Sequence, residues 1–202
     1  MTNPSDEAKI HWPKPFSPDL IRLRVSVTST SEDTVSKMWK SHTDQVFRSW
    51  EVYAPMFSFS KFYEYSTGTP DIEVKIANYG ATGWISRSIV DRNSQYHIKH
   101  GVAELNAFYM SEDWDIHVPY AEGVFGHEFG HLLGLKNNRP GVLDGLPDDT
   151  CMNQVGLLSG NASNRPNGLD ASALDALYSH AEYALPTNDY IWTEVVDTFP
   201  AP

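Results

Sequence analysis

The chain has 202 residues, of which 41% are hydrophobic and 20% are charged, proportions that fit one globular unit with a sizeable core. Its 26 acidic residues outnumber its 15 basic ones and give a formal charge of -11, which excludes the basic surface that nucleic acids and anionic lipids select. No stretch approaches the roughly 20 apolar residues needed to span a bilayer. We therefore expect a monomer with no nucleic-acid and no membrane partner.

The compartment is left open by the sequence. The first twenty residues contain four prolines and scattered charges, and they have no apolar core of signal-peptide length. The chain as written is therefore expected to be cytoplasmic, or secreted if a leader has been removed. The single cysteine, Cys151, cannot form an intrachain disulfide, which suits a reducing compartment and does not exclude export.

Composition divides the chain into three parts. Residues 1–19 form a polar, proline-punctuated arm, residues 20–182 form the main domain, and residues 183–202 form a C-terminal tail with four aromatic residues. The main domain has an upper part that ends near residue 134 and a loop-rich lower part over residues 135–182.

Hydrophobic periodicity predicts the elements of the main domain. Apolar and polar residues alternate over residues 21–27, which indicates a strand buried on one face. A long helix follows, because apolar residues recur at intervals of three and four between Val35 and Trp50. Trp39 and Trp50 are expected to anchor this helix to the sheet.

The remaining pattern predicts further strands, loops and helices in order. Gly80, Gly83 and the polar run 91–95 are typical of surface loops. The other predicted elements are strands at 57–62, 72–76 and 102–110, a helix at 119–135, and a last helix from 169 to about 181.

The most informative stretch lies on the predicted helix 119–135. His127 and His131 are four residues apart, so a helix brings both imidazoles onto one face, where they can bind one zinc ion. Glu128 then lies beside the metal as a base that activates water. Gly134 allows the helix to end and the chain to turn sharply. Asn137 stands where a third histidine is expected.

These residues resemble the metzincin clan of zinc peptidases, and within it the matrixin-like or astacin-like members. The family pattern is His-Glu-x-x-His-x-x-Gly-x-x-His followed by a turn that contains a methionine beneath the metal. The chain matches it at His127, Glu128, His131 and Gly134, and Met152 is similar to the turn methionine. The likeness extends over most of residues 20–182.

The resemblance implies an α+β fold, the metzincin-like zincin fold. Its parts are a twisted mixed sheet with an antiparallel edge strand, a long backing helix, an active-site helix and a C-terminal helix. Residues 103–110 are expected to be the edge strand, which could pair with an extended peptide. Zn²⁺ is the implied cofactor, and Glu128 is the implied general base for peptide hydrolysis.

The sequence departs from the family at the third ligand. An amide oxygen of Asn137 is a weaker zinc ligand than imidazole or carboxylate, and Asp144 is the alternative ligand in the following loop. Gln154 stands where some members have a tyrosine near the metal. His97 and His100 are more typical of surface histidines than of a second metal site.

Three functions follow from these residues. The leading one is a zinc-dependent endopeptidase that acts on an extended polypeptide. The second keeps the metal site but acts on a small molecule. The third is a non-catalytic binding module that has lost its zinc through Asn137, although such a module has no need of Glu128. Cys151 is not expected to be a nucleophile, because no base is indicated beside it.

Overall fold

The structure is a computed structural model, and it describes most of the predicted main domain together with part of each terminus. The described residues are 11–13, 20–29, 34–63, 69–93, 97–110, 118–137, 150–154, 157, 165–179 and 191–200. Within these residues, no helix combines the length and apolar character that crossing a bilayer requires.

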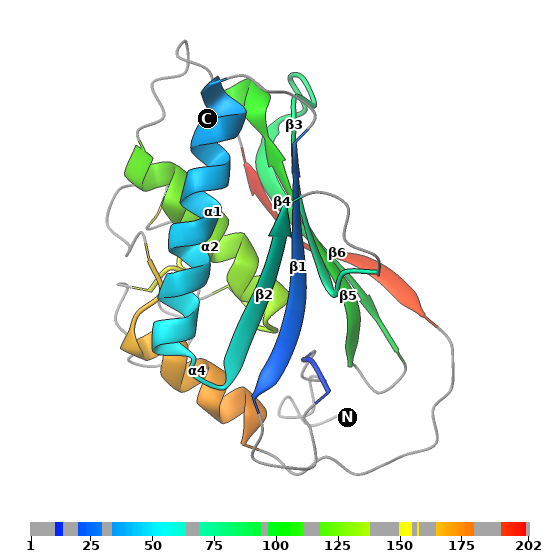
Figure 1. Cartoon of the computed structure of the whole chain (residues 1–202), viewed down its shortest axis with the longest axis vertical. Coiled ribbons are helices and arrows are strands. Elements are labelled where there is room, and N and C mark those ends of the chain that lie inside the picture. The colour runs from blue at the N-terminus through cyan, green and yellow to red at the C-terminus, as the bar shows by residue number, and fades with distance from the viewer. Residues whose placement is uncertain are drawn as a thin grey trace, which may run out of the picture.

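In the part of the chain that the structure describes, the fold consists of one mixed sheet and three α-helices (Figure 1). In chain order the elements are β1 (Ile21–Ser29), α1 (Thr34–Tyr53), β2 (Phe57–Tyr63), β3 (Ile72–Ala77), β4 (Trp84–Arg92), β5 (Ile98–Asn106), the 3₁₀-helix η2 (Ala107–Met110), α2 (Val118–Leu132), α4 (Gly168–Tyr178) and β6 (Trp192–Pro200). The predicted α+β class is confirmed.

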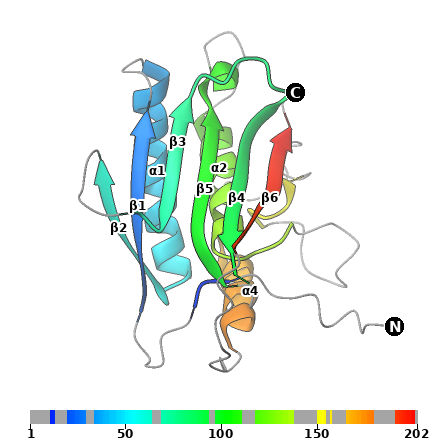
Figure 2. The same cartoon turned by 90° about the vertical axis from the view of Figure 1, so that its right-hand side faces the viewer.

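The six strands lie in the order β2-β1-β3-β5-β4-β6 (Figure 2). β1, β2, β3 and β5 are mutually parallel, whereas β4 runs antiparallel to β5 on one side and to β6 on the other. The C-terminal strand β6 therefore forms one edge of the sheet. β2 forms the other edge.

The predicted strands β1, β2 and β3 are confirmed, and the burial of β3 alternates along the strand as its sequence does. The prediction that residues 103–110 form the antiparallel edge strand is wrong. The strand at this place is β5, which lies inside the sheet and pairs parallel with β3. It ends at Asn106, whose side-chain oxygen accepts a hydrogen bond from the backbone nitrogen of Phe108 (3.1 Å) and so closes a turn.

β4 is the antiparallel strand that contacts α2, and its sequence pattern did not reveal it as a strand. Asp91 and Arg92, expected in a loop, are strand residues. Two fully buried positions of β4 are serines, Ser86 and Ser88, where a one-sided strand normally has apolar side chains. The missing apolar alternation has a specific cause, because both hydroxyls bond to a buried glutamate in α2.

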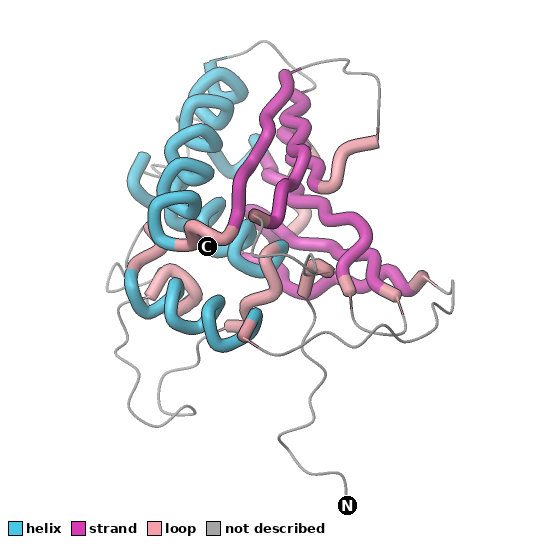
Figure 3. Tube along the Cα trace, turned by 60° about the horizontal axis from the view of Figure 1, so that its bottom comes forward, coloured by secondary structure: helices cyan, strands magenta, loops and turns pink. Residues whose placement is uncertain are grey.

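The helices α1 and α2 cover the same face of the sheet (Figure 3). Phe47 of α1 packs edge-on against Phe125 and Phe129 of α2, with ring centroids 5.6 and 4.8 Å apart. Trp50 is fully buried, as predicted, but its indole nitrogen donates to the Gly126 carbonyl of α2 (3.2 Å) rather than to the sheet. The side chain of Trp39 lies outside the described residues.

The C-terminal end of α2 is held from two other parts of the chain. The indole nitrogen of Trp12 donates to the Leu132 carbonyl (2.7 Å), and the hydroxyl of Tyr178 in α4 donates to the Leu133 carbonyl (2.9 Å). Carbonyls in the last turn of a helix have no partner within the helix, so these bonds stabilise its end. The position of α2, which carries the predicted zinc-binding motif, is thereby fixed.

Candidate metal centre

The predicted zinc-binding motif lies on the last two turns of α2. The helix ends in a Schellman motif, because Gly134 has φ 103° and its nitrogen donates to the His131 carbonyl (2.9 Å), while Leu135 nitrogen donates to the Gly130 carbonyl (3.0 Å). Only glycine adopts this left-handed conformation without strain. The turn brings the carbonyl of Leu135 back towards the histidines.

Both histidines are oriented by backbone carbonyls. His127 Nδ1 lies 2.8 Å from the Cys151 carbonyl, and His131 Nδ1 lies 2.8 Å from the Leu135 carbonyl. Because a carbonyl only accepts hydrogen bonds, Nδ1 carries a proton in each ring. Nε2 then donates to Asp197 when the ring is protonated and presents a lone pair to a cation when the ring is neutral. Histidines that bind metals typically donate their other ring nitrogen to a carbonyl or carboxylate in this way.

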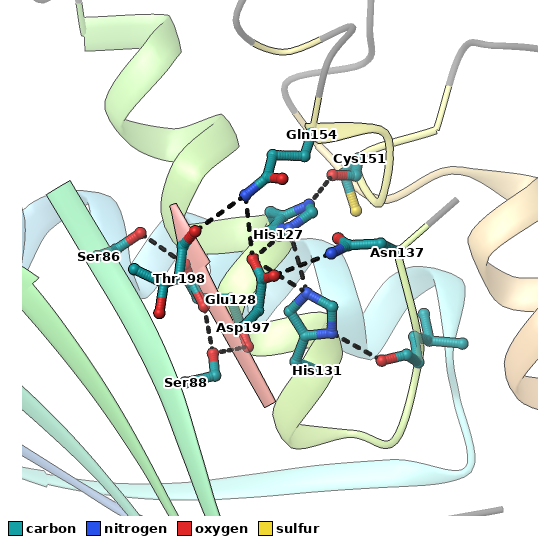
Figure 4. Close-up of polar contacts among 11 residues, drawn as sticks. Ser86, Ser88, His127, Glu128, His131, Asn137, Cys151, Gln154, Asp197 and Thr198 are labelled. Atoms are coloured by element: carbon teal, nitrogen blue, oxygen red, sulfur yellow. Dashed lines mark hydrogen bonds and ion pairs between the residues drawn. The ribbon is translucent and has the colours of Figure 1, made fainter. Parts of the chain in front are cut away.

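The two Nε2 atoms meet a carboxylate from the far end of the chain. They lie 3.1 Å apart, and Asp197 Oδ2 of β6 lies 3.2 Å from His127 Nε2 and 3.6 Å from His131 Nε2 (Figure 4). Ligands about 2.0 to 2.1 Å from a tetrahedral zinc ion are about 3.3 Å apart. The three donor atoms thus match one face of a zinc coordination tetrahedron. Among the described residues this is the one group of His, Cys, Asp and Glu side chains with such spacing.

The donor set also fits a cation chemically. Neutral rings direct two lone pairs at each other and at a carboxylate oxygen, and a shared cation satisfies all three. Although burial raises the pKa of Asp197, hydrogen bonds from His127 and His131 hold it well below its usual range, so the carboxylate is ionised. Burial is the largest single influence on the pKa of His131 and lowers it, but the bond to Asp197, the negative charges of Glu128 and Asp197 and the Leu135 carbonyl together raise the pKa above its ordinary value.

Asp197 is held in place by two residues at which the chain departs from the family pattern. Asn137 Nδ2 donates to Asp197 Oδ1 (2.9 Å). Gln154 Nε2 donates to Asp197 Oδ2 and to the Thr198 carbonyl, both at 3.2 Å. Asn137, expected as a ligand, therefore binds the carboxylate that faces the two histidines. The alternative ligand, Asp144, lies outside the described residues.

A β-bulge directs Asp197 towards the histidines. In the β4–β6 pairing Ser88 faces Asp197, but the next residue, Ile89, faces Val195, so Val196 has no partner residue on β4. An extra residue in one strand bends it and re-aims the neighbouring side chains. His127 and Asp197 are 70 residues apart in sequence, and no spacing rule joins them.

Glu128 is fully buried between α2 and β4. Its Oε1 accepts a hydrogen bond from Ser86 Oγ (2.7 Å), and its Oε2 contacts Ser88 Oγ, which lies 2.9 Å from the Glu128 backbone carbonyl. Burial raises the pKa of Glu128 above its ordinary value, against the lowering effect of the two histidines. A carboxyl with a raised pKa beside a cation-binding group suits proton transfer near neutral pH.

The turn that supplies the Cys151 carbonyl is supported by α4. Asn153 nitrogen donates to the Thr150 carbonyl (3.1 Å), which closes the turn. Asp170 Oδ2 accepts from Cys151 nitrogen (3.3 Å) and from Asn167 nitrogen (3.0 Å), the latter within the capping box of α4. Asp170 therefore links the start of α4 to the carbonyl that orients His127. Cys151 itself is buried, and burial raises the pKa of its thiol well above 9, which argues against a nucleophilic role.

Met152, predicted as the turn methionine, packs beneath the motif helix. It is buried, and a Cβ atom added at Gly130 would lie 2.3 Å from its sulfur and 3.1 Å from the Trp50 ring. We expect Gly130→Ala to lower the free energy of unfolding by about 1 to 3 kcal/mol, measured by urea denaturation, because the added methyl overpacks the core.

Gly168→Ala is the matched control for this substitution. Gly168 is also a helical glycine, and a Cβ added there meets nothing within 4 Å. Its replacement should leave stability unchanged or raise it by up to about 1 kcal/mol, because alanine loses less conformational entropy on folding. Equal stability of the two variants would contradict the tight contact between Met152 and the motif helix.

His97 and His100, which the sequence did not favour as metal ligands, make other contacts. His97 forms an isolated bridge with His11, and its ring lies 5.0 Å from the His11 ring. His100 lies 3.3 Å from a Glu73 carboxylate oxygen and 3.6 Å from one of Asp91.

Comparisons with known proteins bear on the fold. The sequence matches no protein-family model and no curated protein. The structure does match solved structures. One is the crystal structure of archaemetzincin from Methanopyrus kandleri, with a TM-score of 0.50 and 13% sequence identity over 82% of this chain and 99% of that chain. The chain thus has an archaemetzincin-like zincin fold, in agreement with the predicted fold.

Proposed function

We propose that this chain is a zinc-dependent hydrolase, and more specifically an endopeptidase. The observation that carries the proposal is the convergence of His127, His131 and Asp197 on one point beside the buried carboxylate of Glu128. The metzincin-like fold supports it, because both histidines lie on the helix where the sequence motif places them. Asp197 supplies a third donor atom. The absence of a third histidine at Asn137 is therefore no longer an argument for a binding module that has lost its zinc.

Three residues would hold the zinc ion in the described conformation: His127, His131 and Asp197. A bound zinc ion would supply Lewis-acid activation of water and polarisation of a carbonyl group. The chain supplies the base: Glu128 accepts the proton of the attacking water and passes it to the leaving amine. Ser86 and Ser88 hold this carboxylate by hydrogen bonds from β4 and fix its orientation.

An extended polypeptide is the proposed substrate because of β4. This strand runs antiparallel to the rest of the sheet and carries the serines that contact Glu128. Its outer edge pairs with an extended segment in the structure, β6, which supports its capacity to bind a peptide by strand addition. A small-molecule substrate is the second candidate, favoured by the same observation, because β6 covers the edge that a peptide would use.

Metal analysis tests the proposal. Purified protein dialysed against trace zinc should retain about one zinc ion per chain, as a three-ligand site predicts. Removal of the metal with a chelator should abolish cleavage of a peptide library, and added zinc should restore it. A chain that holds no zinc under supplementation would contradict the proposal, and zinc without peptide cleavage would favour the small-molecule candidate.

A further inference from the structure

We propose that the C-terminal strand β6 is an internal inhibitor: it occupies the position of a peptide substrate along β4 and places Asp197 on the metal site. This inference rests on the proposed hydrolase function and adds its regulation. In the described conformation the enzyme is latent, and a peptide gains access when β6 leaves β4.

The first argument is that β6 uses the edge a substrate needs. The pairing covers the whole of β4, from Trp84 opposite Pro200 to Arg92 opposite Trp192 (Figure 2). The other edge of β4 is paired with β5. A peptide that adds as a strand requires unpaired N–H and C=O groups, and β4 has none to offer while both neighbours are in place.

The second argument is that β6 closes the catalytic centre. His127 and Glu128 have no exposed surface, His131 is 4% exposed, and the Asp197 side chain is 11% exposed. Asp197 also faces Ser88, the residue that contacts the catalytic carboxylate. A substrate carbonyl must reach the point between the histidines and Glu128, so the segment that now fills this point has to move.

The third argument is that the described side chains of β6 are less buried than those of the other strands. Each of them is exposed or half-buried, with Val195 55% exposed and Val196 packed against the core, whereas β1, β2, β3, β4 and β5 each have buried side chains. Polar contacts hold β6 in addition to its backbone pairing. Arg92 and Glu194 form an ion pair (3.0 Å), and the Asn137 and Gln154 amides bind Asp197. Among the described side chains of β6, release therefore uncovers no fully buried apolar residue.

Release of β6 also changes the metal site. The carboxylate of Asp197 leaves with the strand, and Asn137 remains as the polar side chain beside the histidines. Its Oδ1 is buried and has no hydrogen-bond partner among the described residues. An amide is a weaker zinc ligand than a carboxylate. The open form is thus expected to hold zinc less tightly than the latent form.

A reversible cross-link between β4 and β6 tests the inference in the full chain. Asp91 pairs with Thr193, and the Thr193 hydroxyl donates to the Asp91 carboxylate, so the two side chains face each other. Asp91→Cys combined with Thr193→Cys places two thiols within disulfide reach. Cys151 is buried and does not compete.

The oxidised double variant should cleave peptides at least about tenfold more slowly than the same protein after reduction, because the link removes the open population. Zinc content should be the same in both forms. A small chelator should strip zinc more slowly from the oxidised form, which gives a readout that does not depend on catalysis.

The matched control links β4 to its other neighbour. Asp91 also pairs with His100 of β5, so Asp91→Cys with His100→Cys forms a disulfide that leaves β6 free. Oxidation of this control should change neither the rate of peptide cleavage nor the rate of zinc loss. This control distinguishes an effect of holding β6 from a general effect of cross-linking β4.

The outcomes separate the two proposals. If zinc binds and cleavage depends on Glu128 but neither rate responds to the β4–β6 link, the hydrolase proposal stands and the inhibitory role of β6 is overturned. If zinc binds but no peptide is cleaved, the test is the rate at which a chelator removes zinc from the oxidised and the reduced forms. Equal rates of zinc removal overturn the inference. If no zinc binds, the hydrolase proposal fails and this inference fails with it.

The Asp197→Asn variant of the full chain provides a second test of the inference. At saturating zinc this variant should cleave peptides faster than the unmodified chain, because the amide competes less well for the site. Slower cleavage at saturating zinc would make Asp197 a working ligand of the active enzyme and would overturn its role as an inhibitor.

Discussion

Replacement of His131 by alanine is expected to remove stoichiometric zinc binding. His131 supplies one of three converging donor atoms, and its Nε2 lies 3.1 Å from that of His127. Changes that only disturb the hydrogen bond of a ligand weaken metal binding by about 10- to 100-fold, so loss of the ligand itself should exceed this range. Zinc content after dialysis and calorimetric titration with zinc both measure the effect.

His100→Ala is the control for loss of a histidine. His100 lies on β5 and contacts Glu73 and Asp91, away from the metal centre. This variant should bind zinc as the unmodified chain does. Both variants should keep the far-ultraviolet circular dichroism of the folded chain, because His131→Ala removes one side chain from a helix that Trp12 and Tyr178 still anchor. Stoichiometric zinc in His131→Ala would contradict the proposed site.

The parts of the fold that are encoded locally could be predicted from sequence. Alternation predicted β1, β2 and β3, and the intervals between His127, His131 and Gly134 predicted the motif helix and its end. In each case neighbouring residues carry the signal, because helix and strand periods bring them onto one face.

β4 could not be predicted because its function alters its pattern. A strand that packs on a helix normally presents apolar side chains to it, but β4 presents Ser86 and Ser88 to Glu128. The carboxylate replaces part of the apolar core, and the serines satisfy its oxygens. The strand could not be recognised at the place where it contacts Glu128, the proposed catalytic residue, as expected when a local pattern yields to a functional site.

The carboxylate at the metal centre could not be predicted because it comes from the opposite end of the chain. Asp197 reaches the histidines through the pairing of β6 with β4 and through a bulge at Val196, and neither leaves a spacing motif. Asn137 and Gln154 did carry a signal, because Asn137 stands at the third-ligand position of the metzincin pattern and Gln154 stands where some metzincins have a tyrosine near the metal. Their amides bind Asp197, so both departures from the family pattern have the same structural consequence.

Glu128→Gln is expected to abolish hydrolysis and to leave zinc bound. Glutamine has nearly the same shape as glutamate, and its amide can still bond to Ser86 and Ser88, whose hydroxyls rotate to donate or accept. The variant should therefore fold. It has no basic carboxylate oxygen to accept the proton of water, and general-base catalysis contributes about 10²- to 10⁴-fold to such reactions.

The measurement compares kcat/KM for a cleaved peptide with zinc content on the same samples. A loss of at least about 100-fold in kcat/KM with full zinc occupancy identifies Glu128 as the base rather than as a structural carboxylate. Ser88→Ala separates the two roles further. It removes a hydrogen bond to the same carboxylate and leaves the base in place, so it should reduce kcat/KM far less than Glu128→Gln does. Retained hydrolysis in Glu128→Gln would exclude Glu128 as the general base, even if zinc is bound.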